Sequence, residues 1–500
     1  MISADVTIDR AFAIGDVDPR LFGGFVEHLG RCVYEGIFEP GHPSADTEGF
    51  RQDVLDLVRE LGVTIVRYPG GNFVSGYNWE DGDGPQGKRP RRMDLAWRST
   101  ETNEIGTNEF MSWCKKAGVE PMFAVNLGTR GPLEAAQLLE YCNHPGGTTL
   151  SDQRRSDGVE TPHNIGFWCL GNEMDGPWQT GQKSPADYGV LARETAKAMR
   201  AVDSTVQLAA CGSSGRDMPT FGTWEYEVLD ACFEHVDFIS IHAYFRDTEN
   251  DQNHFLTNID MMDAYIGEVI AIADAVAAKR RSPKRIMLSF DEWNVWYKAR
   301  TPEHQRQPGY PVATRLLEEV YDMQDALMDG GALITLINRC DRVKAACLAQ
   351  LVNVIAPIMT EPGGKIWRQA IFHPFAETAR RVRGTALRTA AEISQGTSLL
   401  CIAAVHDART GRLVIIALNR DPKSSMRLDA ALVGFSQTWV MEDCLSLHHA
   451  DRHATNTKEA PDTVVPQRNS DISVASGRLN VELPPASWNL ISLLATERPN

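Results

Sequence analysis

Paired cysteines are missing from this sequence. Its 500 residues include ten cysteines, and none belongs to a CxxC motif or to the dense spacing of small secreted proteins. Several stand alone inside apolar runs, as in "FWCLG", "LAACG" and "AACLAQ". We therefore expect reduced thiols in a hydrophobic core and no disulfide framework.

Long apolar segments and an excess of positive charge are also missing. No apolar stretch approaches the ~20 residues that span a bilayer, and "MISADVTIDR" lacks a basic segment followed by an apolar one. Fifty Lys and Arg against 66 Asp and Glu give a net charge of -16, which repels nucleic acid and anionic membranes. The sequence therefore predicts a cytoplasmic protein with no nucleic-acid or membrane partner.

Short apolar runs alternate with amphipathic helical segments from about residue 20 to 340, which is typical of a parallel sheet covered by helices. Because no GxGxxG motif follows the first run, this alternation favours a (β/α)8 TIM barrel over a doubly wound sheet. We predict eight strands, at 21–27, 64–70, 120–126, 165–171, 206–212, 237–243, 285–291 and 332–338.

The C-terminal part of the chain has a different sequence pattern. After about residue 385, short β-rich runs with polar turns predict a β-sandwich of jelly-roll type. We expect a catalytic barrel over residues 15–383 and a sandwich domain over 384–500. Residues 1–14 read as one more strand, and we expect it to join the sandwich.

Two glutamates follow the fourth and seventh predicted strands, and catalytic groups of TIM barrels lie at these strand ends. Glu173 follows "IGFWCLGN", and Glu292 lies in "LSFDEWNVWY". A carboxylate pair is the equipment of glycoside hydrolysis, in which one acid protonates the leaving oxygen and the other attacks or activates water. Tryptophans in the loops after strands 2, 4 and 7 could stack on sugar faces: Trp79, Trp97, Trp178, Trp293 and Trp296.

Simpler interpretations compete with this one. A single Glu after a buried strand is more often an ion-pair partner than a catalyst, but two at strands 4 and 7 favour catalysis. His28 and His242 fit hydrogen-bonded wall positions better than metal ligands, since no HxH pair occurs on a strand. The cluster "HHADRH" could bind zinc but lies in a turn-rich region, and "PGGNFVSG" lacks the Lys-Ser/Thr of a phosphate loop.

Long motifs make the chain resemble a known family, the α-L-arabinofuranosidases of glycoside hydrolase family 51. The similarity runs nearly the full length and includes these segments: "FGGFVEHLGRCVYEGIFEPGHP", "VRYPGGNFVSGYNWEDGDGP", "GNEMDGPWQ", "SFDEWNVWY" and "CLAQLVNVIAPIMTEPGG". One departure is "YKARTPEHQRQPGYP" after strand 7, which leaves the leaving-group preference open.

This resemblance implies roles for particular residues. Glu173 would be the acid/base and Glu292 the nucleophile of a retaining, exo-acting enzyme without metal or organic cofactor. Its substrates would be terminal α-L-arabinofuranosyl residues of arabinan, arabinoxylan or their oligosaccharides. The substrate-binding residues would be Glu27, Asn72, Trp97, Asn172, Trp178, His242, Tyr244 and Gln350. The family resemblance also implies a homohexamer.

Two alternatives stay open from the residues themselves. The same scaffold could carry a β-glycanase or β-xylosidase, or a non-catalytic sugar-binding barrel, although the latter should have lost one glutamate. For a retaining enzyme we expect the two carboxyl groups to lie about 5 to 5.5 Å apart.

Overall fold

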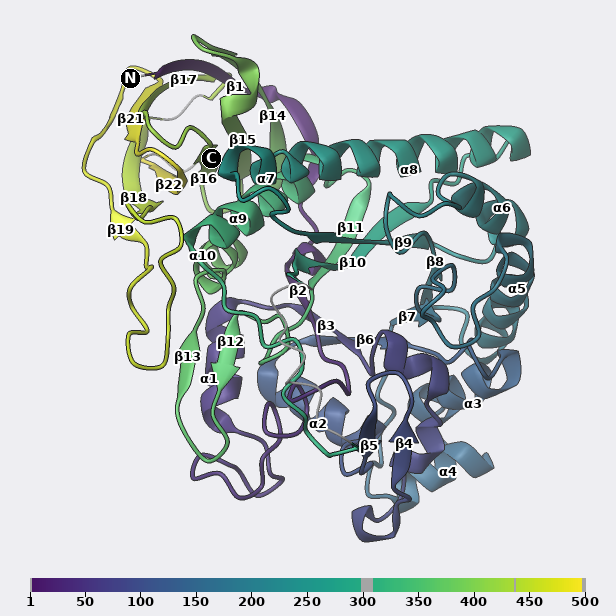
Figure 1. Cartoon of the computed structure of the whole chain (residues 1–500). Helices are drawn as coiled ribbons and strands as arrows, with labels where there is room; N and C mark the ends of the chain where they lie inside the picture. The colour runs from purple at the N-terminus through teal and green to yellow at the C-terminus, as the bar shows by residue number, and fades with distance from the viewer. Residues whose placement is uncertain (1, 298–308, 436–437, 497–500) are drawn as a thin grey trace.

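The computed structural model describes residues 2–297, 309–435 and 438–496, which form a barrel with a curled β-sheet beside it (Figure 1). All ten cysteines are free, and nine of them are buried, as expected from their apolar surroundings. Within the described residues, none of the helices has both the length and the apolar character needed to cross a membrane.

Eight parallel strands close into a barrel, which confirms the predicted TIM-like fold. The strands are short and buried because helices cover the outside of the barrel while side chains fill its interior. In barrel order they are β2 (Gly23–Phe25), β3 (Ile65–Tyr68), β6 (Glu120–Ala124), β7 (Phe167–Leu170), β8 (Gln207–Cys211), β9 (Phe238–Phe245), β10 (Met287–Val295) and β11 (Val343–Leu348).

The helices pack around this barrel with one apolar face inward. In α1, Val54, Leu57, Val58 and Leu61 recur at helical spacing and are buried. The helix α5 begins after Ser184, whose hydroxyl accepts the Asp187 N–H. The α-helices are α1 (Gln52–Leu61), α2 (Thr107–Ala117), α3 (Pro132–Asn143), α4 (Thr149–Ser156), α5 (Pro185–Val202), α6 (Thr223–Cys232), α7 (Gln252–Leu256), α8 (Asn258–Arg280), α9 (Met323–Asn338) and α10 (Phe372–Arg381).

The predicted position of the eighth strand is wrong. Residues 332–338, "ALITLIN", form the end of α9, and the eighth strand is β11, which pairs with β10 and β2. The helix is buried along its whole length, from Met323 to Ile337, because it lies between the barrel and the C-terminal sheet. A helix buried on all sides has no polar face, so its apolar run cannot be distinguished from a buried strand by periodicity.

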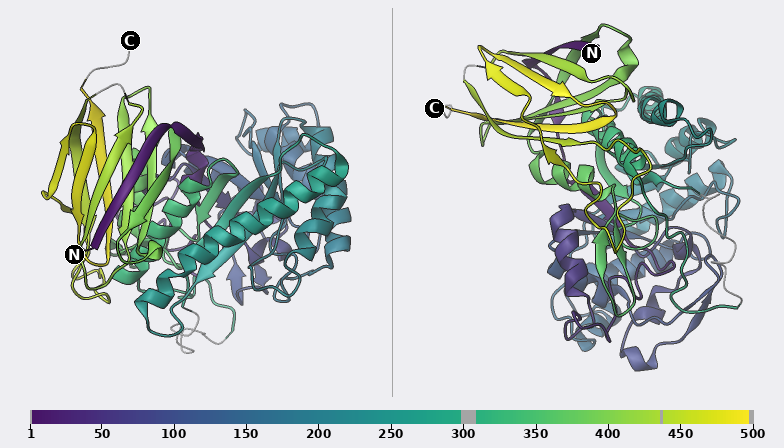
Figure 2. Two further views of the ribbon diagram at one scale, coloured as in Figure 1. Left: turned by 90° about the horizontal axis from the view of Figure 1, so that it is seen from above. Right: turned by 60° about the vertical axis from the view of Figure 1, so that its left-hand side comes forward.

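The C-terminal strands form one ten-stranded sheet that curls around its own apolar core, with Ile8, Ile415, Leu428 and Ile491 among the buried residues (Figure 2). The first strand of the chain, β1 (Ile2–Asp16), lies in this sheet between β14 and β17. The predicted boundary between residues 383 and 384 stays a prediction. The other strands are β14 (Thr385–Ile393), β15 (Leu400–Asp407), β16 (Arg412–Asn419), β17 (Met426–Val433), β18 (Trp439–Leu447), β19 (Gln467–Arg468), β20 (Ile472–Ala475), β21 (Arg478–Leu483) and β22 (Ser487–Ala495).

Short elements complete the described fold. Two small hairpins extend from the barrel. The first of them, which contains Trp97, reaches the carboxyl ends of the barrel strands. The hairpins are β4 (Arg92–Asp94) with β5 (Ser99–Glu101), and β12 (Ile358–Thr360) with β13 (Ile366–Arg368). The 3-10 helices are η1 (Pro19–Phe22), η2 (Asn72–Gly76), η3 (Trp79–Gly82), η4 (Gln86–Lys88) and η6 (Thr397–Leu399).

One buried acid in α9 predicts a pH-dependent stability. Within the described part of the chain, neither carboxylate oxygen of Asp329 has a hydrogen-bond partner, and burial raises the pKa of Asp329 well above its ordinary value. The folded state therefore binds the proton of the Asp329 carboxyl group more tightly than the unfolded state does. The contribution of protonated Asp329 to the stability of the fold is full below pH about 4. Above that pH it is lost by about 1.4 kcal/mol per pH unit, up to the folded-state pKa.

We therefore expect Asp329→Asn to gain stability relative to the wild type as pH rises from 5 to 8. Urea unfolding at several pH values measures this difference. The exposed Asp5 provides the matched control, since Asp5→Asn should leave the pH dependence unchanged. Parallel curves for wild type and Asp329→Asn would contradict the expectation.

Candidate active site

The two glutamates meet at the carboxyl ends of the barrel strands. Glu173 lies just beyond β7, with φ of 41°, and Glu292 lies within β10, which is longer than predicted. Both are nearly buried, with 8% and 5% of their surface exposed. One carboxylate oxygen of each and one ring nitrogen of His242 all lie within 4.8 Å of one another. The structure therefore brings together the two acids that the sequence singles out.

Glu292 is held by two donors. Arg67, from β3, donates from Nη1 to Oε1 at 2.7 Å, and the Tyr244 hydroxyl, from β9, donates to Oε2 at 2.7 Å. The same guanidinium donates from Nη2 to Asn172 Oδ1 at 2.8 Å. Glu292 therefore faces a permanent positive charge, which favours its ionised form and fixes its orientation.

Glu173 has different partners. Its Oε1 lies 3.0 Å from His242 Nδ1, and its Oε2 accepts the indole N–H of Trp178 at 2.6 Å. Burial opposes a charged imidazole, but Glu292, Asp291 and Glu173 together outweigh it and raise the pKa of His242 to about 10. His242 is therefore a cation at neutral pH, and both of its ring nitrogens are donors.

A third carboxylate lies beneath this pair. Asp291 is fully buried; its Oδ1 lies 3.1 Å from His242 Nε2 and accepts the hydroxyl of Ser240, while its Oδ2 lies 3.6 Å from Arg67 Nε. Burial alone would raise its pKa, but Arg67 and His242 lower the pKa of Asp291 to about 2. Asp291 is thus the counter-anion of the two cations that contact Glu173 and Glu292.

We expect Asp291→Asn to reduce kcat roughly 10- to 100-fold, because a small displacement of His242 and Arg67 misplaces both acids. Removing one of the carboxylates that raise the pKa of His242 also lowers that pKa. The loss of activity on the alkaline side should then begin at a lower pH, which a kcat profile against pH measures. In the control Ser240→Ala the charge remains and the shift should be small. Superimposable profiles would contradict this role.

Glu27 lies on the other side of Glu292. It accepts from the Phe73 N–H (3.1 Å), from Trp97 Nε1 (2.9 Å) and from Gln350 Nε2 (3.0 Å). Burial and, secondly, the charge of Glu292 raise the pKa of Glu27 to about 8. The raised pKa brings the protonation of Glu27 close to neutral pH, and the protonated form can donate a hydrogen bond as well as accept one.

The glycines of "PGGNFVSG" make this convergence possible. A Cβ on Gly71 would lie 3.0 Å from Glu292 Oε1, 3.4 Å from Asn172 Nδ2 and 3.5 Å from Glu27 Oε2. The backbone at Gly71 therefore borders three of the predicted site residues and leaves no room for a side chain. Asn72 follows at the start of η2 and is half-buried.

The five predicted tryptophans occupy different positions around the site. Trp97 and Trp178 donate to Glu27 and Glu173, whereas Trp79 and Trp293 are buried in the core and cannot stack on a sugar. Trp296 packs edge-on against Tyr244, with ring centroids 5.2 Å apart. The unusual segment after strand 7 falls mostly on residues 298–308, which lie outside the described residues.

The histidine clusters fit hydrogen bonding better than metal binding. His28 contacts Glu101 Oε2 and the Tyr68 hydroxyl, each at 2.8 Å, and His453 Nδ1 lies 2.8 Å from Asp322 Oδ2. In the described part of the chain, the one group with metal-ligand spacing is Glu173, His242 and Glu292. Both ring nitrogens of His242 lie beside carboxylates, Nδ1 beside Glu173 and Nε2 beside Asp291, so these contacts also form a hydrogen-bonded network.

Sequence reasoning assigned no role to Arg67 or to Ser240. The signal for Ser240 was available, because residues two apart on a strand share a face and Ser240 precedes His242 by two.

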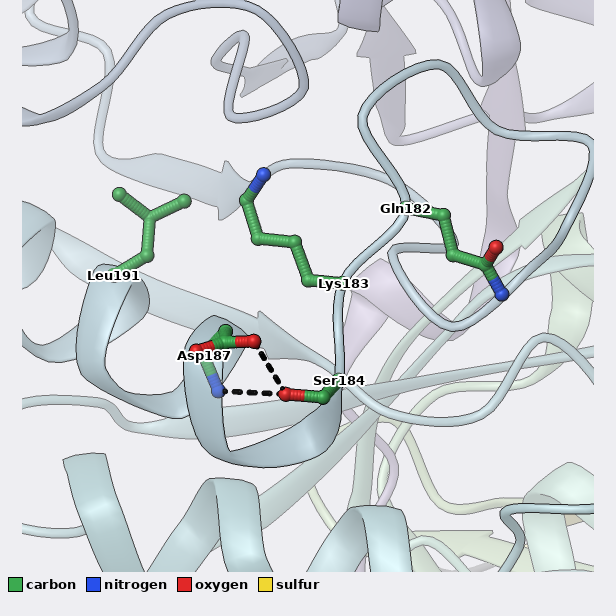
Figure 3. Close-up of a pocket in the computed structure, with 5 residues that line it drawn as sticks. All are labelled: Gln182, Lys183, Ser184, Asp187 and Leu191. Carbon is green, nitrogen blue, oxygen red and sulfur yellow. Dashed lines mark hydrogen bonds between the residues drawn. The ribbon is translucent and has the colours of Figure 1, made fainter.

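A separate open hollow of about 700 Å³ lies on the loop before α5 (Figure 3). Its lining contains none of the predicted site residues: Gln182, Lys183, Ser184, Asp187 and Leu191.

Comparison with known proteins places this geometry in a family. Residues 57–265 match the family "Alpha-L-arabinofuranosidase 1 domain", and residues 291–487 match "Alpha-L-arabinofuranosidase C-terminal domain". The intracellular exo-α-(1→5)-L-arabinofuranosidase of Halalkalibacterium halodurans is 50% identical over 98% of this chain and 99% of its own. An exo-α-(1→6)-L-arabinofuranosidase of Bifidobacterium longum is 49% identical over 97% of this chain and 96% of its own.

Solved structures show the same similarity. A family 51 α-L-arabinofuranosidase from Bifidobacterium longum superposes with a TM-score of 0.94 at 46% identity, over 98% of this chain and 99% of that one. An arabinose complex of the Thermotoga maritima α-L-arabinofuranosidase has a TM-score of 0.87 at 31% identity, over 98% and 99%. With full-length relatives at about half identity, this chain belongs to the family 51 α-L-arabinofuranosidases.

Proposed function

We propose that this protein is a retaining, exo-acting α-L-arabinofuranosidase that works by double displacement. The observation that carries the proposal is the pairing of Glu173 and Glu292, which lie at the ends of β7 and β10 with one carboxylate oxygen of each within 4.8 Å of the other. Inverting enzymes keep their carboxyl groups about 6.5 to 9.5 Å apart to admit a water molecule, whereas retaining enzymes keep them about 5 to 5.5 Å apart. The spacing here favours direct attack on the sugar.

The surroundings of the two acids support separate roles. Arg67 and Tyr244 orient Glu292, and the charges of His242 and Arg67 oppose the rise in the pKa of Glu292 that burial causes, as a nucleophile requires. Glu173 contacts Trp178, which is 52% exposed, so this acid lies on the side from which a leaving group departs. We infer that Glu292 forms the glycosyl-enzyme bond, while Glu173 first protonates the leaving oxygen and then deprotonates the attacking water.

The remaining predicted residues would bind the arabinofuranosyl ring. Glu27, Asn172 and Gln350 offer acceptors and donors around Gly71, and a neutral Glu27 can donate to a sugar hydroxyl. We propose that Asn72, His242 and Tyr244 complete the polar wall, and that Trp97 and Trp178 form its rim. The resulting site would hold one terminal furanose, in keeping with exo action.

The natural substrate is proposed from the relatives. Several are named for α-(1→5) and one for α-(1→6) linkages, so we propose terminal α-(1→5)-linked arabinofuranose of arabinan or its oligosaccharides as the preferred substrate, with arabinoxylan as a further source. Relatives named intracellular support the same location for this chain. We further propose a homohexamer that needs no metal or organic cofactor.

Proton NMR of the first products tests the proposal. On nitrophenyl α-L-arabinofuranoside we expect free arabinose to appear first as the α-anomer and only later to equilibrate. The matching β-xyloside and β-glucoside serve as controls and should be hydrolysed far more slowly. A first-formed β-anomer would refute the covalent route, and faster cleavage of the β-xyloside would favour a β-xylosidase.

A further inference from the structure

Trp178 occupies an unexpected position for a residue at the rim of a sugar site. Its indole Nε1–H donates to Glu173 Oε2 at 2.6 Å, although the ring is 52% exposed and Glu173 is nearly buried. The contact therefore occupies the more accessible oxygen of the proposed acid/base. The other oxygen, Oε1, faces His242, which is buried.

Both oxygens of Glu173 accept hydrogen bonds in this arrangement. An indole nitrogen can only donate, and His242 as a cation also donates from Nδ1. A carboxylate accepts strongly at both oxygens, whereas the hydroxyl oxygen of a protonated carboxyl group is a weaker acceptor, so protonation weakens one of these two bonds. The geometry therefore suits the ionised form of Glu173, which serves as the base, better than the protonated form, which serves as the acid.

The hydrogen bond that protonation weakens is the one from Trp178 to Oε2. His242 is fixed from behind by Asp291, so a proton on Oε1 would face a donor that cannot turn away. Trp178 is attached to a surface loop and has solvent on one side. A proton on Oε2 can therefore be accommodated if the indole withdraws, and this oxygen is then open to the leaving-group oxygen.

Gly176 makes the contact possible. A Cβ at this position would lie 2.6 Å from Cε2 and 2.9 Å from Nε1 of Trp178, closer than real Cβ atoms approach other atoms. The indole thus reaches Glu173 by lying directly against the backbone of Gly176, whose N–H donates to the Glu173 carbonyl at 2.8 Å. Any side chain here would push the ring outward.

We propose that Trp178 is a proton-linked positioning residue, whose indole N–H holds Glu173 as the base and withdraws when Glu173 carries the proton of the acid. The inference rests on the proposed function, because it assumes that Glu173 serves both steps. Gly176 supplies the space for the held position. In the first step the proton on Oε2 passes to the leaving-group oxygen; the ionised carboxylate then regains the indole contact and keeps a further lone pair on Oε2 to take a proton from the attacking water.

The substitution Glu173→Gln tests this proposal, because an amide is uncharged like the protonated acid and its NH2 group cannot accept a hydrogen bond. His242 requires an acceptor, so the amide oxygen must take the Oε1 position and its NH2 group must face the indole N–H. Acrylamide quenching of Trp178, isolated by subtracting the matching Trp178→Phe variants, reports its exposure. We expect quenching to rise about twofold, from a ring that is 52% exposed to one that is free.

Three comparisons sharpen the test. Asp175→Asn, the same change two residues away on the same loop, should leave quenching unchanged. Gly176→Ala should raise it as much as Glu173→Gln, and the double variant should show no further rise.

Equal quenching in the wild type and Glu173→Gln would overturn the proposal. So would a rise in Asp175→Asn as large as that in Glu173→Gln, since it would show a general loosening of the loop. These readouts do not depend on turnover. Lack of hydrolysis of arabinofuranosides by the wild type would instead refute the proposed function.

Discussion

Glu292→Ala is expected to abolish turnover on every arabinofuranoside, by about five to six orders of magnitude in kcat, as when other catalytic nucleophiles are removed. Without this carboxylate no glycosyl-enzyme bond can form. Arg67 and Tyr244 would lose their acceptor, so thermal unfolding should accompany the kinetics to show that the variant is folded. Initial rates on nitrophenyl α-L-arabinofuranoside measure the loss.

Added azide should restore turnover in Glu292→Ala, which gives the prediction a product that can be detected. In the space left by Glu292 the anion can attack the face from which the carboxylate would have attacked, while Glu173 still protonates the leaving group. The product should be the β-azide, identified by NMR. Near-normal hydrolysis without azide would move the nucleophile elsewhere, and Asp291 would be the first residue to test, despite its full burial and its pairing with His242 and Arg67.

Glu173→Ala should affect substrates according to how strongly their leaving group needs a proton. Arabino-oligosaccharides leave as poor alkoxides, so their kcat/KM should fall by roughly three to four orders of magnitude, near the upper limit for general acid catalysis. A dinitrophenyl arabinofuranoside needs no proton and should still form the intermediate rapidly. A burst of dinitrophenol followed by a slow phase would show that breakdown of the intermediate has become limiting.

Azide again identifies the step. Because it needs no general base, it should restore turnover of the dinitrophenyl substrate in Glu173→Ala and yield the α-azide, by two inversions at the same carbon. Trp178→Phe serves as a comparison variant, since it removes the hydrogen bond to Glu173 and leaves the Glu173 carboxylate in place. An equal loss on both substrates, or a β-azide, would assign the acid/base role to another residue.

The sequence was sufficient to predict the barrel and the two acids, because both depend on local patterns. Strand ends are marked where an apolar run meets Asn172 or Asp291, and the barrel directs all such ends to one face. The position of the eighth strand was wrong for a physical reason: α9 is enclosed by the barrel and the C-terminal sheet, and so carries no polar face to mark its helical period.

The electrostatic layer beneath the acids could not be predicted in the same way. That Asp291 neutralises both Arg67 and His242 depends on distances across three strands, β3, β9 and β10, which no spacing along the chain encodes. The same holds for Trp178, whose stacking interpretation required only an aromatic ring, whereas its bond to Glu173 depends on the absence of a side chain at Gly176.

The place of β1 in the C-terminal sheet has a consequence for how the chain is made. This strand is synthesised before the barrel strands, yet Ala4 pairs with Ile393 and Ile2 with Met426, so it must wait until the strands β14 and β17 have been synthesised. Until then its edges are unpaired, with the hazard of wrong association that exposed strands carry. Closing so long a loop is slow, and the two ends of the chain therefore mature together, after the barrel strands between them have already emerged.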